Sequence, residues 1–276
     1  MVRHLISAEH LAQIIDDRTL RLVDCRWYLA DPDEGPAAYG RGHIPGAVHA
    51  SLDHHLSGTT GPGRHPLPSP DEFAETMASL GISPESTVVV YDDRGGAVAS
   101  RLWWMLTAQG HTSVAVLDGG IQAWTTQDRP LTTDVPTPER SVYDMEPWTG
   151  IVTLEEVAAR EPGTTLIDAR EPERYRGDIE PIDPKAGHIP GAVSLPVAAN
   201  LDENGFFRPS NDLASCFSAI GVAGGARVIA HCGSGVTACH SILAAEIAGL
   251  GRPDLYVGSW SEWSGTDQPV ATGEAP

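Results

Sequence analysis

Positive charge is scarce in this 276-residue chain, which carries 18 Lys and Arg residues against 37 Asp and Glu residues, a formal net charge of −19. Nucleic acids and anionic membrane surfaces bind through basic patches, so this balance argues against either one as a general partner. An anionic small molecule would need a few cations gathered at one place. We therefore expect no nucleic acid and no membrane as partner.

Cysteines and long apolar runs are also few. The four cysteines show no paired spacing, which indicates free thiols and a reducing cytoplasm. No stretch approaches the roughly 18 uninterrupted apolar residues of a membrane-spanning helix. The opening residues 1–17 lack an apolar core followed by a small-residue cleavage site. We interpret them as a helix capped by Ser7, not as a signal peptide.

The sequence contains an internal repeat. Both copies include the motif HIPGA, beginning at residues 43 and 188, and Asp92 of the first copy falls where Cys232 of the second copy falls. The matching segments are 22–48 with 166–193, 88–102 with 227–243, and 117–124 with 256–263. Because these landmarks recur in one order, the chain is interpreted as a duplicated domain.

Within each copy, short β-branched runs alternate with helix-period segments. This alternation predicts an α/β fold in which a mainly parallel sheet is covered by helices on both faces. We expect domains at 1–128 and 151–276, joined by a linker at 129–150 that is rich in Pro and Thr. The Pro- and Gly-rich stretch 57–70 is predicted to be a long loop inside the first domain, of the kind that lines sites.

Cys232 stands at a corner between a strand that ends at His231 and a helix that begins near Thr237. In an open parallel sheet, ligands bind at the carboxyl ends of the strands. Unpaired N–H groups at a helix start carry partial positive charge, which stabilises a thiolate and raises its reactivity. Gly233 and Gly235 let the backbone curl into a nest for an anion. We predict a nucleophilic Cys232, against the alternative of a buried structural cysteine.

Other uses of this cysteine fit the sequence less well. Six residues separate Cys232 from Cys239, whereas structural zinc sites prefer about two to four. A cysteine phosphatase needs an arginine six residues after its cysteine, and that position here is Ala238. The two cysteines also lack the C-x-x-C spacing of a redox pair. We expect no metal and no organic cofactor.

The two HIPGA motifs, the CGSGVT loop (232–237) and the GSWSEW segment (258–263) resemble tandem-domain rhodanese sulfurtransferases over essentially the whole chain. The resemblance implies two rhodanese-like domains, of which the second is catalytic and the first has lost its cysteine. It implies that Cys232 forms a persulfide and passes the sulfur to cyanide or a thiol. Substrate-binding backbone groups are then expected at Gly233, Gly235, Val236 and Thr237.

The uncharged loop is similar to that of the 3-mercaptopyruvate branch, whereas thiosulfate-preferring members carry basic residues there. In that branch the loop serine, here Ser234, joins a histidine and an aspartate of the N-terminal copy. By alignment these are His65 and Asp53, with a suggested role in proton supply. The alternative for His65 is a solvated loop histidine, since this stretch also offers His54 and His55.

Recognition of the donor's carboxylate is assigned by the same resemblance to Arg174, against the alternative of a salt bridge with neighbouring glutamates. The branch carries a second arginine nine residues later, where this chain has Asp183. Lys185 is therefore the candidate for the missing charge, and thiosulfate remains the rival donor. Arg170, just after Asp168, is expected to serve structure.

The expected acceptor is cyanide or a thiol, with thioredoxin as a candidate protein acceptor. A different class of function stays open, in which the chain is a persulfide carrier or sulfur-binding module that takes sulfur from a partner protein. Rapid pyruvate release from 3-mercaptopyruvate distinguishes the enzyme from the carrier.

Overall fold

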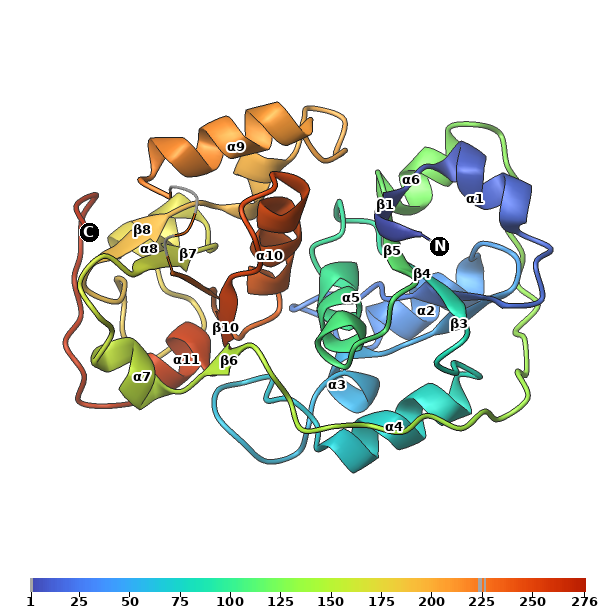
Figure 1. Cartoon of the computed structure of the whole chain (residues 1–276), viewed down its shortest axis with the longest axis horizontal. Coiled ribbons are helices and arrows are strands. Elements are labelled where there is room, and N and C mark those ends of the chain that lie inside the picture. The colour runs from blue at the N-terminus through green and yellow to red at the C-terminus, as the bar shows by residue number, and fades with distance from the viewer. Residues whose placement is uncertain (1, 223–224, 226) are drawn as a thin grey trace. The chain divides into compact units, whose positions relative to one another are not determined.

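The computed structural model describes residues 2–222, 225 and 227–276, and it divides the chain into two compact units (Figure 1). The first unit contains residues 2–58, 68–149 and 204–206. The second contains residues 59–67, 150–203 and the described part of 207–276. The tip of the predicted loop, residues 59–67, thus belongs to the second unit and not to the domain in which its sequence lies.

The first unit is built on a five-stranded sheet with the order β1-β5-β4-β2-β3, and its strand pairs are parallel. Its elements are β1 (Arg3–Ile6), α1 (Ala8–Ile14), β2 (Leu20–Asp24), α2 (Glu34–Arg41), β3 (Ala47–His49), α3 (Leu52–His55), α4 (Pro70–Ser79), β4 (Thr87–Tyr91), α5 (Ala99–Ala108), β5 (Val114–Leu117) and α6 (Gly120–Thr125).

The second unit repeats this sheet with the order β6-β10-β9-β7-β8, again with parallel pairs. Its elements are β6 (Ile151–Val152), α7 (Leu154–Ala158), β7 (Thr165–Asp168), α8 (Pro172–Arg176), β8 (Ala192–Ser194), the 3-10 helix η1 (Val197–Asn200), α9 (Ser210–Ala219), β9 (Val228–His231), α10 (Ala238–Ile247), β10 (Asp254–Tyr256) and α11 (Ser259–Trp263).

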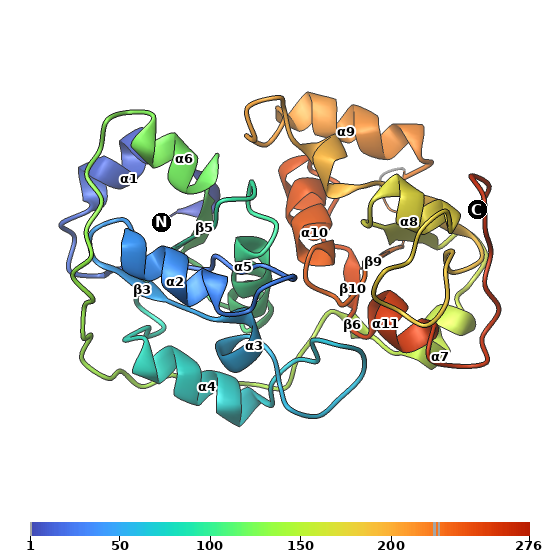
Figure 2. The ribbon, with the colours of Figure 1, turned by 180° about the vertical axis from the view of Figure 1, so that it is seen from behind.

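Helices cover both faces of each sheet. In the first unit, Leu11 of α1 and Trp124 of α6 pack with Val89 of β4 in one apolar core, and α5 contacts β4 and β5 on the other side (Figure 2). In the second unit, Val157 of α7 and Trp260 of α11 share a core, while α9 and α10 lie on the opposite face of the sheet (Figure 1). The predicted α/β class and the duplication are confirmed.

The repeated HIPGA motif has a structural role in both units. Tyr39 stacks on His43 with ring centroids 3.9 Å apart, and Tyr175 stacks on His188 at 3.8 Å. Each histidine also bonds through Nδ1 to the carbonyl of the tyrosine on which it stacks, at 2.9 and 2.8 Å. These histidines are fully buried, so the motif fixes the entry to β3 and β8 and supplies no reactive group.

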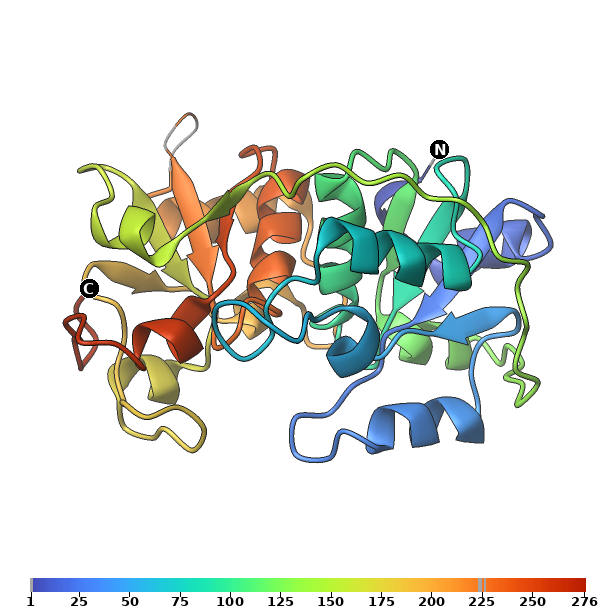
Figure 3. The ribbon, with the colours of Figure 1, turned by 90° about the horizontal axis from the view of Figure 1, so that it is seen from below.

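The segment 129–150 is extended and packs along the first unit, as its yellow-green trace shows in Figure 3. Thr132 exchanges two backbone hydrogen bonds with His43. Tyr143 is buried and its hydroxyl pairs with Nδ1 of His111 at 2.9 Å. Trp148 donates its indole N–H to the carbonyl of Pro68 at 2.8 Å. The segment has no periodicity in sequence because its anchors are single side chains on the folded unit.

The N-terminal helix α1 begins as predicted. Ser7 is its N-cap, and its hydroxyl accepts the N–H of His10 at 3.1 Å. The strand β1 that precedes the helix was not predicted, because only one of its four residues is fully buried and its pattern carries little alternation. Met1, where the predicted segment starts, lies outside the described residues.

A buried ion pair repeats at the end of the second strand of each unit. Arg26 contacts Asp24 at 2.6 Å and donates to the carbonyl of Gly42, and Arg170 contacts Asp168 at 2.6 Å and donates to the carbonyl of Gly187. Each arginine therefore ties a strand end to the residue just before HIPGA. A structural role for Arg170, as predicted, accords with these contacts.

We predict that Arg26→Met destabilises the first unit by about 3 kcal/mol, because the substitution leaves the Asp24 carboxylate buried without its partner. Urea denaturation followed by tryptophan fluorescence measures the loss. Arg41→Met is the matched control, since Arg41 pairs with Glu34 on the solvent-exposed side of α2 and its removal should leave the midpoint unchanged. Equal midpoints for wild type and Arg26→Met would contradict a stabilising role for the buried pair.

Candidate functional site

Cys232 follows β9 directly, at the carboxyl end of the second sheet. Gly235 turns the loop with φ +74°, and a Cβ at this position would lie 2.5 Å from the carbonyl oxygen of Val257, so only glycine fits. The helix α10 then starts at Ala238, and its N-cap residue Thr237 makes no side-chain capping bond. The predicted strand–loop–helix corner is therefore present. In the first turn of α10, the N–H groups of Cys239 and His240 donate to the carbonyls of Val236 and Thr237, both at 3.1 Å.

Hydrogen bonds to the first two residues of α11 fix the N–H and the carbonyl of Cys232. The N–H of Cys232 donates to the hydroxyl of Ser259 at 3.2 Å, and its carbonyl accepts the N–H of Trp260 at 3.0 Å. Ser259 has a left-handed φ of +53°, and its counterpart in the first unit, Gly120, has φ +59°. The sequence analysis missed Ser259, although its alignment with a glycine was a signal of an unusual backbone.

The first unit shows what the equivalent loop binds when a carboxylate stands in place of the cysteine. Asp92 accepts hydrogen bonds from the N–H groups of Arg94, Gly96, Val98 and Ala99, at 2.7 to 2.9 Å. The last two N–H groups belong to the start of α5, so Asp92 acts as the cap of that helix. Burial raises the pKa of Asp92, whereas these four N–H groups lower it, so the backbone donors at this corner favour the charged form of the carboxyl group.

The groups near the two corners differ in their ability to react. Burial lowers the pKa of His231, so this residue is a neutral neighbour of Cys232 and adds no positive charge. In the first unit, burial and the nearby Asp24 and Asp92 carboxylates raise the pKa of the Cys25 thiol well above its ordinary value. Cys25 is accordingly a poor nucleophile.

His65 and Ser234 form the predicted pair. Nδ1 of His65 lies 2.8 Å from Oγ of Ser234, and both residues are buried. Although His65 lies in the sequence of the first copy, it belongs to the second unit. The third predicted member, Asp53, belongs to the first unit, where it lies on α3 and accepts the indole N–H of Trp27 at 2.7 Å.

The segment 63–65 is seated on the residues that hold Cys232. The N–H of Arg64 donates to Oγ of Ser261 at 3.0 Å, while the N–H of Ser261 donates to the carbonyl of Gly233 at 2.8 Å. Gly63 has φ +73°, and a side chain on it would collide with the carbonyl oxygen of Gly258. Gly63 and Arg64 thus contact Gly258 and Ser261 at the start of α11, and the next residue, His65, contacts Ser234 of the Cys232 loop.

Arg174 lies beside the cysteine loop. Its Nη1 is 3.3 Å from the point that a Cβ of Gly233 would occupy. Its Nη2 pairs with Glu180 at 2.7 Å and with Asp183 at 2.9 Å. Salt bridges do engage the arginine, but with carboxylates later in the chain instead of the neighbouring glutamates that the sequence suggested.

The remaining predicted positions contribute differently. Gly233, Gly235, Val236 and Thr237 form the turn between β9 and α10. The ammonium group of Lys185 donates to the carbonyl of Thr266, and its own carbonyl accepts the indole N–H of Trp260 at 3.0 Å. These bonds direct the Lys185 ammonium to Thr266, and a contact with the donor stays a prediction.

The sequence analysis missed Arg64, whose guanidinium also reaches Gly233. Nη2 of Arg64 is 3.4 Å from the Cβ point of Gly233, and Nη1 pairs with Asp183 at 2.8 Å. Arg64 immediately precedes His65, but the sequence of this loop does not indicate that Arg64 pairs with Asp183, more than a hundred residues later. The only hint was the acidic Asp183, which would need a cation if buried.

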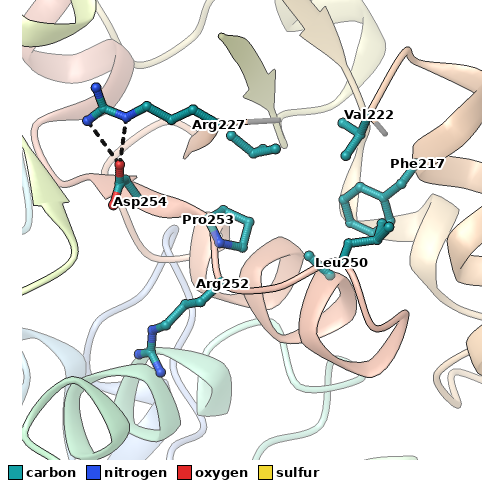
Figure 4. Close-up of a pocket in the computed structure, with 9 residues that line it drawn as sticks. Phe217, Val222, Arg227, Leu250, Arg252, Pro253 and Asp254 are labelled. Carbon is teal, nitrogen blue, oxygen red and sulfur yellow. Dashed lines mark hydrogen bonds and ion pairs between the residues drawn. The ribbon is translucent and has the colours of Figure 1, made fainter. Parts of the chain in front are cut away.

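A small cavity of about 90 Å³ lies elsewhere in the second unit. It is lined by Arg227 and Val228 at the start of β9 and by Asp254 at the start of β10, together with Phe217 and Leu250 (Figure 4). Arg227 and Asp254 close part of it as an ion pair. Because Cys232 follows the opposite end of β9, this cavity is not part of the cysteine site.

Neither metal nor membrane features appear in what the structure describes. Within residues 2–222, 225 and 227–276, no group of three or more His, Cys, Asp or Glu side chains is arranged to hold a metal ion. None of the helices in these same ranges has the length and apolarity that crossing a bilayer requires.

Comparison with known proteins gives the class of the chain. The model of the rhodanese-like domain matches twice, at residues 7–127 and 153–266. A protein of Pseudomonas aeruginosa, provisionally named 3-mercaptopyruvate sulfurtransferase, is 42% identical over 284 residues and covers 98% of both chains. SseB of Mycobacterium tuberculosis, provisionally named a thiosulfate sulfurtransferase, is 42% identical over 280 residues with the same coverage.

Solved structures agree with this class. The crystal structure of SseA from Escherichia coli, described as a 3-mercaptopyruvate sulfotransferase with the rhodanese fold, matches with a TM-score of 0.84 and 32% identity. It covers 95% of this chain and the chain covers all of it. The chain therefore belongs to the family of proteins built from rhodanese-like domains.

We predict that Gly63→Ala loosens the loop 59–67 without unfolding the second unit, because alanine strains a positive φ and collides with Gly258 and Ser261. Hydrogen–deuterium exchange of peptides from this loop should become faster. Gly40→Ala is the control, since Gly40 lies in α2 with no atom near its Cβ point and the substitution should leave exchange of the loop unchanged. Unaltered protection of the loop in Gly63→Ala would show that this seat does not hold it.

Proposed function

We propose that this protein is a sulfurtransferase that takes sulfur from 3-mercaptopyruvate, carries it as a persulfide on Cys232 and delivers it to a thiol or to cyanide. The proposal rests on the strand–loop–helix corner that occurs at the equivalent position of each unit. Its loop binds a carboxylate, that of Asp92, through four backbone N–H groups in one unit, and presents Cys232 at the same position in the other.

In the first step the Cys232 thiolate attacks the sulfur of 3-mercaptopyruvate. A sulfur–sulfur bond forms, the carbon–sulfur bond breaks, and its electron pair goes to the methylene carbon. The sulfur is oxidised to the sulfane level while the carbon is reduced and leaves as the enolate of pyruvate. The N–H groups from Gly233 to Thr237 stabilise the negative charge on the terminal sulfur, as the first unit's loop does for Asp92.

The enolate needs one proton to become pyruvate. Ser234 follows Cys232 by two residues, and its hydroxyl pairs with Nδ1 of the buried His65. In the proposed role the hydroxyl protonates the enolate carbon and regains its proton from His65. Asp53 is the proposed third member of this proton-supplying group.

In the second step an acceptor attacks the outer sulfur of the persulfide, the sulfur–sulfur bond breaks, and its electron pair returns to Cys232 as thiolate. Cyanide then leaves as thiocyanate, and a thiol leaves as a persulfide. Thioredoxin is a suitable protein acceptor because its thiol can attack the same sulfur. The four cysteines are free, which supports a reducing compartment such as the cytoplasm.

In this proposal the domains divide the work. The domain at 151–276 carries the reactive cysteine, the domain at 1–128 is not catalytic because Asp92 replaces the cysteine, and residues 129–150 link them. Arg174 beside Gly233 is the proposed contact for the donor's carboxylate.

Thiosulfate is the second candidate donor. The supporting observation is that SseB, named for that donor, is as similar to this chain as the Pseudomonas relative named for 3-mercaptopyruvate. The two donors separate in one experiment, a steady-state assay of each with cyanide as acceptor. We expect the higher kcat/KM with 3-mercaptopyruvate, because the loop around Cys232 carries no basic side chain for a second negative charge.

We predict that Cys232→Ser abolishes sulfur transfer and leaves the fold intact, because the serine hydroxyl is too weak a nucleophile in this setting. Thiocyanate formation and pyruvate release are measured together with the mass of the protein after exposure to the donor. Wild type should gain one sulfur atom and the variant none. Cys216→Ser is the control, since Cys216 lies on α9 away from the loop. Turnover of Cys232→Ser near the wild-type rate would refute the proposed function.

We predict that Ser234→Ala lowers kcat with 3-mercaptopyruvate by about a hundredfold or more, the usual range for loss of a proton donor. Thiosulfate turnover should fall less, because the departing sulfite needs no proton on carbon. Both rates are measured on one enzyme preparation. Equal losses with the two donors would argue against proton delivery by Ser234 and leave it a structural role in the loop.

A further inference from the structure

Two carboxylates that the proposed mechanism does not use are buried near Cys232. Glu180 and Asp183 belong to the segment 178–186, which follows α8. Their side chains are only 3% and 4% exposed. A carboxylate is seldom buried to this degree unless a cation pairs with it, because removing the charge from water is costly. Their partners therefore show what these two charges act on.

Asp183 binds two arginines at once. Its Oδ1 accepts a hydrogen bond from Nη1 of Arg64 at 2.8 Å, and its Oδ2 accepts one from Nη2 of Arg174 at 2.9 Å. The other terminal nitrogens of these two guanidinium groups lie 3.4 and 3.3 Å from the point that a Cβ of Gly233 would occupy. The carboxylate of Asp183 is therefore one guanidinium group away from the residue that follows Cys232.

Glu180 supplies the second negative charge. Its Oε1 accepts a hydrogen bond from Nη2 of Arg174 at 2.7 Å, and also from the backbone N–H groups of Ile182 and Asp183 at 3.2 and 3.1 Å. The segment thus turns around the Glu180 carboxylate, which brings Asp183 to the arginines. The two carboxylates balance the charges of Arg64 and Arg174, so this group of four side chains is neutral as a whole.

The base of this segment is fixed. It is flanked by Gly177 and Gly187, and a Cβ on Gly177 would lie 3.1 Å from the backbone nitrogen of Gly187, so the two ends meet. A Cβ on Gly187 would collide with the carbonyl oxygen of Ala271. The indole N–H of Trp260 donates to the carbonyl of Lys185 at 3.0 Å. The negative charge of the segment is therefore in place before a donor arrives, and it acts on every anion that approaches.

We infer that Asp183 determines donor specificity by charge, so that the site accepts the single carboxylate of 3-mercaptopyruvate and disfavours the two negative charges of thiosulfate. This inference rests on the proposed function, because it concerns the choice between its two candidate donors. The second charge of thiosulfate is repelled by the fixed carboxylate of Asp183. Specificity of this kind comes from an unfavourable interaction with the wrong donor.

The expected size of the effect follows from Coulomb's law. In a partly buried site, a unit charge at the separation of one guanidinium group changes the binding of an anion by about tenfold or more. Thiosulfate carries one charge more than 3-mercaptopyruvate, and the alkylating agent iodoacetate carries one charge more than neutral iodoacetamide. Removing the charge of Asp183 should therefore shift both comparisons in the same direction and by a similar factor.

The test uses the full chain and compares wild type with Asp183→Asn, Asp183→Glu and Asp178→Asn. Asp178 is the matched control, since it lies in the same segment but is 54% exposed and pairs with Arg176. In Asp183→Asn, kcat/KM for thiosulfate relative to that for 3-mercaptopyruvate should rise about tenfold. Asp183→Glu keeps the charge and should keep the wild-type ratio, even where both rates fall. Asp178→Asn should behave as wild type.

A second readout does not depend on turnover. The rates at which iodoacetate and iodoacetamide alkylate Cys232 are measured by mass spectrometry of the peptide that contains it. The ratio of the iodoacetate rate to the iodoacetamide rate should rise about tenfold in Asp183→Asn. A merely structural role of Asp183 would change both rates together and leave this ratio unaltered. If Asp183→Asn does not fold, Glu180→Gln removes the other buried carboxylate and is measured in the same way.

The outcomes separate the inference from the proposed function. If wild type turns over 3-mercaptopyruvate and neither ratio changes in Asp183→Asn, the inference is wrong and the function stands. Equal shifts in Asp183→Asn and Asp183→Glu would also overturn it, because geometry and not charge would then be responsible. If wild type turns over neither donor, the proposed function fails and the alkylation ratio decides. A rise in Asp183→Asn would then support control of anions by Asp183, and an unchanged ratio would refute it.

Discussion

Two backbone hydrogen bonds govern the site, those that join the carbonyls of Cys232 and Gly233 to the N–H groups of Trp260 and Ser261. They attach the cysteine loop to the start of α11, whose indole Trp260 is fully buried in the core of the second unit. The loop consequently takes its position from the core, and the segment with Arg64 takes its position from Ser261. Disturbing this attachment would displace Cys232 and its neighbours together.

Much of the fold could be predicted because the sequence contains it as two repeats. Buried parallel strands such as β7 and β9 appear as continuous apolar runs, and the landmark motifs recur in the same order. The strand β1 escaped prediction because it lies at the edge of its sheet and is only partly buried. The membership of residues 59–67 in the second unit also escaped, since it depends on glycine conformations and backbone contacts, and not on periodicity.

The candidate site, like the fold, has features that the sequence predicted and features that it did not. The position of Cys232 and the pairing of His65 with Ser234 could be foreseen, the first from the strand–loop–helix pattern and the second from family resemblance. The partners of Asp183 could not be foreseen, because in the sequence a carboxylate at the position of an expected arginine indicates only that a positive charge is missing. In space it gathers two arginines. Lys185 was chosen for being near in sequence, but its ammonium group bonds to Thr266.

The bonds that Asp92 makes in the first unit bear on how duplicated sites diverge. The carboxylate there is tethered to the chain, so the four donors around it are always occupied and the start of α5 is permanently capped. The start of α10 has no side-chain cap of this kind from Thr237. One copy has thus become a corner closed by its own side chain, whereas the equivalent corner of the other copy carries Cys232 and has no carboxylate tethered there.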